Sequence, residues 1–123
     1  MITTAVTNVN ELPFEHLAMY SSYGRLGTII KKGMVCECCR KGAVHFVAME
    51  RKGYGSLTFA LFTEDWVELT VDHIKPKHLG GQNNSENYQV LCQYCNNIKG
   101  CLELTVDELR RLIGKVFNNV VKM

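Results

Sequence analysis

Two stretches in the middle of the chain carry the hydrophobic pattern of β-strands. Residues 44–49 are mostly apolar with β-branched or aromatic side chains, and residues 57–62 are apolar again. Residues 52–56, Lys-Gly-Tyr-Gly-Ser, have the composition of a turn, so the pattern predicts a β-hairpin. Alternation over residues 66–71 predicts another strand, which leads directly into Asp72-His73-Ile74.

The clearest helical pattern lies at the end of the chain. Thr105-Val106-Asp107-Glu108 has the form of a capping box, in which two side chains bond to the free backbone N–H groups of a helix start. Apolar residues then recur at the spacing of an amphipathic helix: Leu109, Leu112, Ile113, Val116, Phe117 and Val120. This pattern predicts a C-terminal helix.

The remaining elements are shorter. Pro13 is expected to open a helix that carries Phe14, Leu17, Met19 and Tyr20. Residues 88–91 predict a short strand, and residues 93–99 a helix that Gly100 ends. Residues 1–11 show no periodicity, and glycines at 24, 27 and 33 indicate irregular structure before the first cysteines. Residues 75–87 contain turn-forming residues and predict a structured loop.

Length and composition favour one small α+β domain. A chain of 123 residues with 46% hydrophobic residues fits a single unit with a thin core. We expect an N-terminal arm with a short helix over residues 1–33, a core over residues 34–104 and the last helix over residues 105–123. The net charge of +2 permits a nucleic-acid partner without requiring one. No apolar run reaches membrane-span length and no signal-peptide layout opens the chain, so an intracellular, cytoplasmic protein without a membrane partner is expected.

Two cysteine pairs indicate a metal site. Cys36 and Cys39 form one Cys-x-x-Cys pair, and Cys92 and Cys95 form another. Four thiolates in this two-plus-two arrangement are typical of structural zinc, which has no redox chemistry and needs no open position. The other reading, free core thiols or a redox pair, lacks the thioredoxin-like context that a redox pair requires. Cys38 and Cys101 are left over and are expected to be spare.

Three polar residues flank the second cysteine pair in a pattern that suggests catalysis. Asp72 and His73 end a predicted strand, and Asn96 follows Cys95 directly, on the helix that zinc would hold in place. The oxygens of Asp72 and Asn96 are hard ligands suited to Mg²⁺ or Mn²⁺, and His73 beside them would act as a base. Adjacent strand residues point to opposite faces, so a bulge or the start of a loop is expected at Asp72-His73.

These residues stand in a longer pattern. Val71-Asp72-His73-Ile74-x-Pro76-x-x-x-Gly80-Gly81 is followed by Asn87-x-Gln89-x-Leu91-Cys92-x-x-Cys95-Asn96-x-x-Lys99-Gly100. The pattern resembles the motif of the HNH (His-Asn-His) endonucleases. The resemblance covers about residues 71–100 and reaches back to Cys36 if the first cysteine pair is included.

The resemblance implies a ββα-metal fold and metal-dependent hydrolysis of DNA, expected to be double-stranded. It implies His73 as the general base and Asp72 and Asn96 as ligands of one divalent cation, Mg²⁺ or another such as Mn²⁺. Asn87 would tie the long loop and so orient the histidine. The family's last position is Asn96 here rather than a histidine, which leaves the choice of cation open.

Several biological settings are compatible with that resemblance. Restriction, intron homing, phage packaging, repair and toxin action all use the motif, and a phage-encoded or mobile-element protein would act in the host cytoplasm. The unit would nick one strand alone, cut both as a homodimer, or serve a larger nuclease complex. The alternative from another class is a zinc-stabilised DNA-binding or adaptor module without catalysis.

Other polar residues near the motif have weaker expectations. Lys99 would touch a phosphate or the leaving oxygen, or lie as a solvated lysine. Lys75, Lys77 and His78 would follow a nucleic-acid backbone, or simply form a charged loop. His16, His45 and Trp66 lie in apolar company and are expected to be packing residues.

Overall fold

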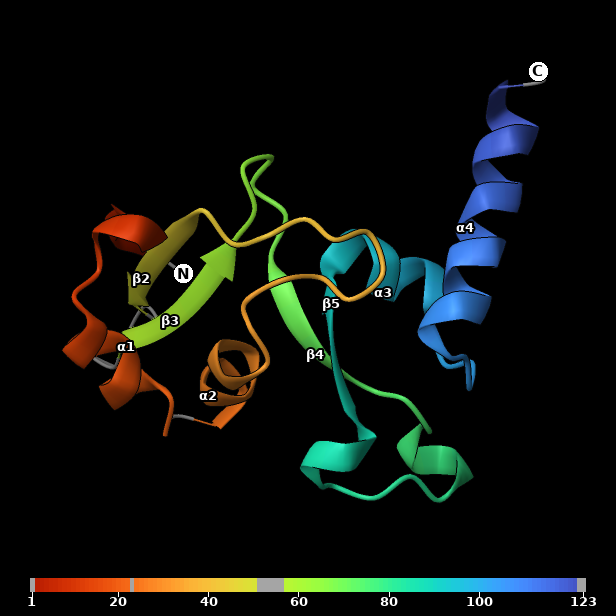
Figure 1. Ribbon diagram of the computed structural model, residues 1–123, viewed down its shortest axis with the longest axis horizontal. Coiled ribbons are helices and arrows are strands. Elements are labelled where there is room, and N and C mark those ends of the chain that lie inside the picture. Colours follow the sequence, from red (N-terminus) through yellow and green to blue (C-terminus); the bar gives the residue numbers. More distant parts are fainter. Residues whose placement is uncertain (1, 23, 51–56, 122–123) are drawn as a thin grey trace.

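The computed structural model describes residues 2–22, 24–50 and 57–121, which form two antiparallel sheets and four helices (Figure 1). The strands are β1 (Ile2–Asn8), β2 (His45–Glu50), β3 (Leu57–Phe62), β4 (Leu69–His73) and β5 (Tyr88–Cys92). The helices are α1 (Phe14–Tyr20), α2 (Gly24–Lys31), α3 (Gln93–Lys99) and α4 (Val106–Val121). Short 3-10 turns lie at Val9–Glu11, Lys77–Leu79 and Ser85–Asn87. The protein is therefore a small α+β structure, as the sequence predicts.

The three-stranded sheet has the order β1-β2-β3. The predicted hairpin is confirmed, since His45 lies opposite Phe62 and Glu50 opposite Leu57. The turn expected at residues 52–56 lies outside the described residues. Residues 1–11, which show no periodicity in the sequence, contain β1, which pairs with β2 from Ile2 to Asn8 with a shift of register between Thr3 and Ala5. Its threonine and valine content has a high β-propensity that outweighs the missing alternation.

The stretch with three glycines also differs from expectation, because it contains α2. Leu26 and Ile29 lie one turn apart and are both buried. A Cβ at Gly27 would lie 2.4 Å from the carbonyl oxygen of Ser21. This glycine therefore does not break the helix but lets α2 approach the end of α1, a helix that matches the prediction from Pro13.

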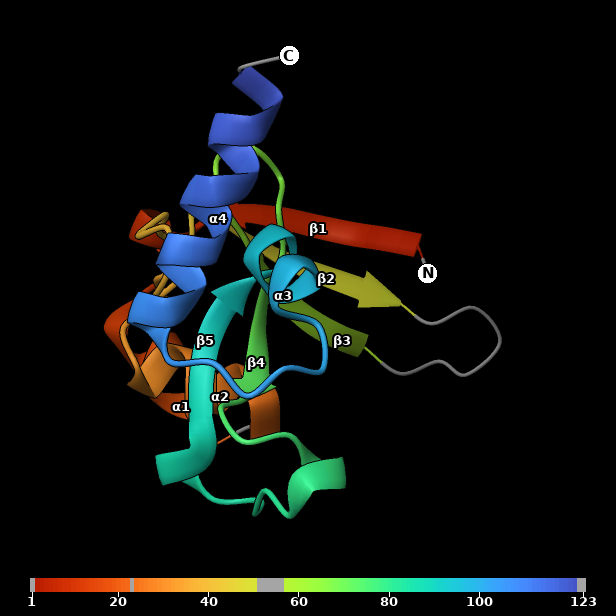
Figure 2. The same cartoon turned by 90° about the vertical axis from the view of Figure 1, so that its right-hand side faces the viewer.

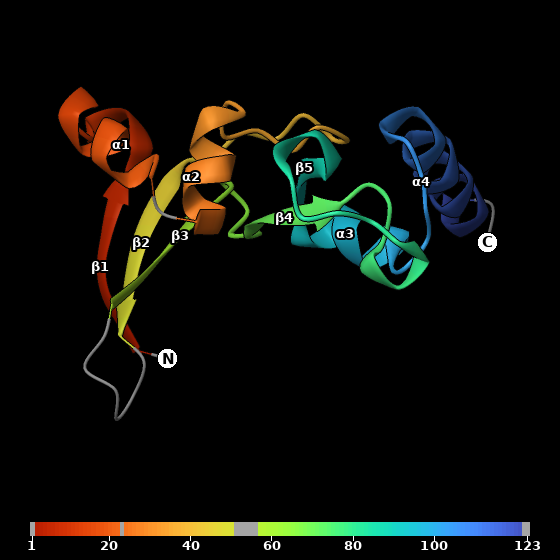
Figure 3. The same ribbon diagram turned by 90° about the horizontal axis from the view of Figure 1, so that it is seen from below.

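The second sheet and α3 form a ββα unit. β4 pairs with β5, and Cys92 at the end of β5 caps the start of α3. α3 lies against one face of this pair, whereas α2 contacts β4 from the other face (Figure 2). The helix ends at Gly100, whose φ of 58° lies in the left-handed region that glycine adopts readily. Figure 3 shows this unit between the three-stranded sheet and α4.

The C-terminal helix packs on the core through Leu109 and Ile113 and is also held by an arginine. Leu109 is completely buried in the core. The Arg110 guanidinium donates to the carbonyl oxygens of Glu37 at 2.7 Å and Cys38 at 2.9 Å. The capping box is confirmed, since Thr105 and Glu108 each accept from the other's backbone N–H at 3.2 Å. No helix in the described part of the chain is long and apolar enough to cross a membrane.

Candidate metal centre and active site

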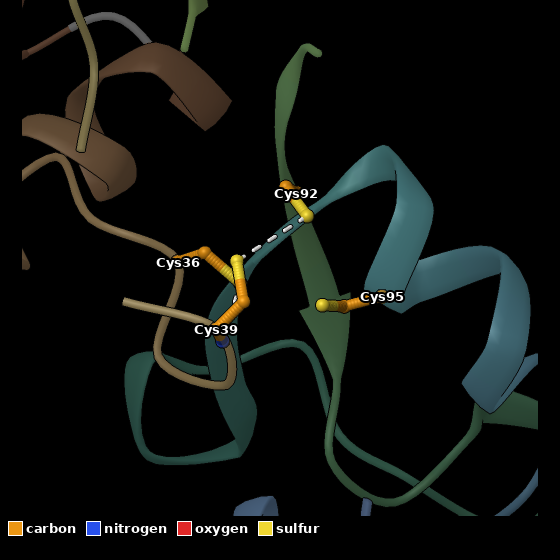
Figure 4. Close-up of side chains that lie close together, drawn as sticks. All are labelled: Cys36, Cys39, Cys92 and Cys95. Atoms are coloured by element: carbon orange, nitrogen blue, oxygen red, sulfur yellow. Dashed lines mark hydrogen bonds between the residues drawn. The ribbon is translucent and has the colours of Figure 1, made fainter. Parts of the chain in front are cut away.

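The four paired cysteines converge on one point. Their sulfur atoms, from Cys36, Cys39, Cys92 and Cys95, all lie within 4.8 Å of one another (Figure 4). Two come from the turn between α2 and β2, and two from the junction of β5 with α3. Three of these residues are buried, and Cys39 is exposed. The donor set and its closeness fit a tetrahedral zinc ion, so this cluster could hold the metal that the spacing predicts.

The cysteines of the cluster differ in the direction of their pKa shifts. Burial raises the pKa of Cys39 to about 11, and burial with the neighbouring thiolates raises that of Cys95 further. Burial also acts to raise the pKa of Cys36, but backbone hydrogen bonds, led by Cys92, lower it overall. Four thiolates this close together would repel one another, so a bound cation would stabilise them in the deprotonated form.

The first cysteine turn is fixed to the second sheet by Glu37. Its backbone N–H donates to the carbonyl oxygen of Val90 at 2.8 Å, and its carboxylate accepts from the Val90 N–H. The two remaining cysteines lie outside the cluster: Cys38 is buried and Cys101 is exposed. The turn is thus positioned by β5 independently of the four sulfur atoms.

Asp72 and His73 occupy the end of β4. The pairing of β4 with β5 is continuous from Leu69 to His73, so the expected bulge is absent and the loop starts after His73. Alternation places Asp72 towards α3 and His73 towards α2. Both residues nevertheless line one cavity of about 370 Å³, together with Lys77, His78 and Lys99. The end of the strand, rather than a distortion, brings both residues to this cavity.

The Asp72 carboxylate is held by two donors. One of its oxygens, Oδ2, accepts from Gln89 Nε2 at 3.0 Å and lies 2.9 Å from the Lys99 ammonium. The Lys99 side chain is fully buried and also donates to the carbonyl oxygen of His73 at 3.0 Å. The expectation of a solvated lysine is therefore wrong, because Lys99 supports Asp72 and the strand end from inside the protein.

Asn96 lies one turn before Lys99 on the same face of α3. Its Nδ2 donates to the hydroxyl of Thr70 at 2.9 Å, and that hydroxyl donates to the Leu91 carbonyl at 2.7 Å. Thr70 and Asp72 are two residues apart on β4 and therefore share the face that α3 covers. The helix thus presents Asn96 and Lys99 to Thr70 and Asp72, respectively.

Two oxygen atoms of this arrangement remain available to a cation. Oδ1 of Asp72 and Oδ1 of Asn96 have no hydrogen-bond partner among the described residues. No buried side-chain oxygen or nitrogen within the described ranges lacks a partner, so both atoms reach solvent. A carboxylate and an amide oxygen fit a Mg²⁺ or Mn²⁺ ion that keeps several waters.

The imidazole of His73 is held by a residue that sequence reasoning missed. Its Nε2 lies 2.8 Å from Oδ1 of Asn83, and its ring meets Tyr88 edge to face at 5.1 Å. Asn83 is interpretable from sequence only as a loop-forming residue. Its position ten residues after the histidine, in the loop that returns to the site, is the one signal that could have pointed to it.

Asn87 ties the two ends of that loop together. Its side chain donates to the carbonyl oxygens of Lys75 and Gln82 at 3.0 and 2.9 Å and accepts from the Lys75 N–H at 2.9 Å. Gly81 lies so close that a Cβ would be 1.7 Å from the Lys75 carbonyl oxygen. The spacing of glycine and asparagine in the motif is therefore explained by the close return of this loop.

The other polar residues singled out in the sequence lie at the surface. Lys75, Lys77 and His78 are exposed, and the last two line the cavity beside His73. The packing role expected for His16 is wrong, because it is exposed on α1. Trp66 is 53% exposed and stacks on His45 with ring centroids 3.7 Å apart, so it is not a core residue.

Comparison with known proteins agrees with the site. Residues 60–101 match the family model described as HNH endonuclease. The matched residues are about a third of the chain and include β4, β5, α3 and the second cysteine pair, so the resemblance seen in the sequence is confirmed over this range. No curated protein and no solved structure matches the chain.

Proposed function

We propose that this protein is a metal-dependent endonuclease that hydrolyses phosphodiester bonds in DNA. The observation that carries the proposal is the shared cavity at the end of β4, where Asp72, His73 and Lys99 meet within the segment that matches the HNH family. The whole chain would act as one domain, with the cysteine cluster holding a structural zinc ion that positions α3.

His73 is the proposed general base. The Asn83 side-chain oxygen can only accept a hydrogen bond, so Nε2 carries the proton and Nδ1 keeps its lone pair. Nδ1 takes a proton from water, the hydroxide oxygen bonds to phosphorus, and the bond from phosphorus to the 3′ oxygen breaks. The leaving oxygen takes a proton from solvent, and the phosphate stays on the 5′ side. Asn87 supports this step by fixing the loop that carries Asn83.

Asp72 and Asn96 would hold the divalent cation through their two available oxygens. A bound Mg²⁺ or Mn²⁺ would neutralise charge that develops on the phosphate and the leaving oxygen. The chain's own contribution is to fix these ligands: Gln89 and Lys99 hold Asp72, while Thr70 holds Asn96. Lys75, Lys77 and His78 would contact the nucleic-acid backbone beside the cavity.

A non-catalytic zinc-stabilised DNA-binding or adaptor module is the second candidate. The ion pair between Lys99 and Asp72 favours it, because an ammonium at 2.9 Å already balances the carboxylate and weakens its attraction for a second cation. The position of His73 at the cavity that contains Asp72, with its imidazole oriented by Asn83, favours the nuclease, since a binding module needs no oriented base.

Cleavage of supercoiled plasmid separates the two candidates. The zinc-loaded protein is incubated with Mg²⁺, Mn²⁺ or Ni²⁺, and the products are followed on a gel and mapped at their ends. We expect duplex DNA to be cut with 5′-phosphate ends. Nicked product would indicate that a single unit cuts one strand, whereas linear product would indicate a homodimer or a larger complex that cuts both. A parallel incubation with an RNA substrate shows whether RNA is cut as well.

Substitution of the base tests the mechanism. His73→Ala should lower kcat by roughly 10²–10⁴-fold, while zinc content and circular dichroism stay unchanged. The matched control is His16→Ala, because His16 is an exposed histidine on α1. Equal rates for wild type and His73→Ala would refute the assignment, and no cutting with any cation would favour the binding module.

A further inference from the structure

A second cavity opens on the other side of His73, between α2 and the loop after β4. Its volume is about 570 Å³, and it is lined by Arg25, Thr28, His73, Lys77, Asn83 and Tyr88, among others. It shares His73 and Lys77 with the cavity that contains Asp72. The proposed base therefore stands between two cavities, one of which contains the carboxylate and the other a surface of α2.

The charge of this second cavity is one-sided. Its lining includes the cations of Arg25 and Lys77 and contains no carboxylate. Neither cationic group has an ion-pair or hydrogen-bond partner within residues 2–22, 24–50 and 57–121. Both residues are exposed, so their charges remain available to a ligand.

The position of Arg25 in its helix does not favour a positive charge. It lies in the first turn of α2, where the helix dipole disfavours a positive charge, and no acidic residue in that turn offsets it. A cation retained at an unfavourable position, beside a cavity with no negative group, is suited to an anionic ligand.

We propose that this cavity, which we call the α2 groove, binds the backbone of a nucleic-acid strand, with Arg25 and Lys77 contacting phosphates on the approach to His73. The identity of the ligand rests on the proposed function, since the strand that enters the groove is the one His73 would act on. Arg25 lies outside the residues that match the HNH family, so this contact extends the substrate surface beyond that segment.

The test measures binding without cleavage. Fluorescence anisotropy of a labelled DNA duplex is recorded over a series of NaCl concentrations, with zinc-loaded protein and no added Mg²⁺ or Mn²⁺. Arg25→Gln should raise Kd about five- to tenfold and lower the slope of log Kd against log salt by about one unit, as expected for one lost phosphate contact. Arg25→Lys, which keeps the charge, should keep most of the slope.

The matched control is Arg111→Gln, an exposed arginine on α4. It should bind like the wild type, and inorganic phosphate at millimolar concentration should not displace the duplex. Equal losses in Arg25→Gln and Arg111→Gln would overturn the proposal, as would an unchanged Arg25→Gln or a wild type without salt-dependent binding.

Cleavage kinetics separate this inference from the proposed function. Arg25→Gln should raise KM and leave kcat unchanged, whereas loss of His73 lowers kcat. If DNA binding depends on Arg25 but no DNA is cut, the α2 groove is supported and the proposed nuclease activity is refuted. If DNA is cut and Arg25→Gln leaves KM unaltered, the α2 groove alone is refuted.

Discussion

Replacement of Lys99 by methionine should destabilise the protein strongly, although Lys99 belongs to a charged residue type that is normally exposed. Its side chain is fully buried, and its ammonium lies 2.9 Å from Asp72 Oδ2 and 3.0 Å from the His73 carbonyl oxygen. Methionine has a similar length and keeps the packing of the stem. The substitution therefore removes the charge and two hydrogen bonds without leaving a large cavity.

The size of the expected loss of stability depends on the contacts that Asp72 keeps in the Lys99→Met variant. Removing one partner of a buried ion pair costs about 3–5 kcal/mol. Asp72 is 11% exposed and keeps its bond from Gln89, which places the loss near the lower end. We expect the free energy of unfolding to fall by about 3 kcal/mol, a large part of the stability of a small domain.

Urea unfolding followed by circular dichroism, at constant zinc, measures this loss. Addition of Asp72→Asn to Lys99→Met should restore part of it, because the unpaired carboxylate is then gone. Lys115→Met, at an exposed position on α4, is the control and should stay within about 0.5 kcal/mol of wild type. A Lys99→Met variant as stable as this control would show that the pair does not hold the site together.

Other perturbations test separate parts of the structure. Removal of zinc by a strong chelator should abolish cooperative unfolding, since structural zinc contributes about 10–16 kcal/mol of apparent binding free energy, and unchanged melting would contradict this. Asn83→Leu should lower kcat with little change in KM, because it removes the hydrogen bond to His73. Asn83→Asp keeps an acceptor oxygen and should have a kcat near that of wild type. Asn97→Leu, on α3, is the control and should leave kcat unchanged. Arg110→Met should release α4 from the first cysteine turn and increase hydrogen exchange in that helix. Hydrogen bonds from Thr105 lower the pKa of Glu108 below its ordinary value of 4.5. The Glu108 carboxylate should therefore stabilise the protein fully above pH 4.5, and this stabilisation should be lost as the pH falls through the lowered pKa. Glu108→Gln should remove that pH dependence, which urea unfolding at several pH values measures.

Elements with a local signal could be predicted from the sequence. The capping box, the hairpin strands and the glycine that ends α3 depend on neighbouring residues, and each is found where it was expected. The sequence does not reveal α2, because Gly27 inside it is typical of a break in a helix. Its actual role, the close contact with Ser21, depends on packing between helices and has no local signature.

The candidate site divides in the same way. Asn96 could be picked out because it follows a regularly spaced cysteine pair, and Asp72 and His73 because they end a predicted strand within the same motif. The burial of Lys99 and the bond from His73 to Asn83 depend on how α3 and the loop return to β4, which the sequence pattern does not encode. The apolar neighbours of Trp66 predict a packing residue, yet Trp66 is exposed and adopts a φ of 63°.

The two halves of the cysteine cluster lie on either side of the hairpin of β2 and β3. The chain leaves the cluster after Cys39, builds two strands of the first sheet, and returns through β4 and β5 to Cys92. If a metal ion joins the four cysteines, the chain between Cys39 and Cys92 forms a closed loop that contains the hairpin. The entropic cost of closing such a loop rises only with the logarithm of its length. Variants of this protein could therefore carry hairpins of very different size, while closure of the cluster keeps α3 and Asn96 in register with Asp72.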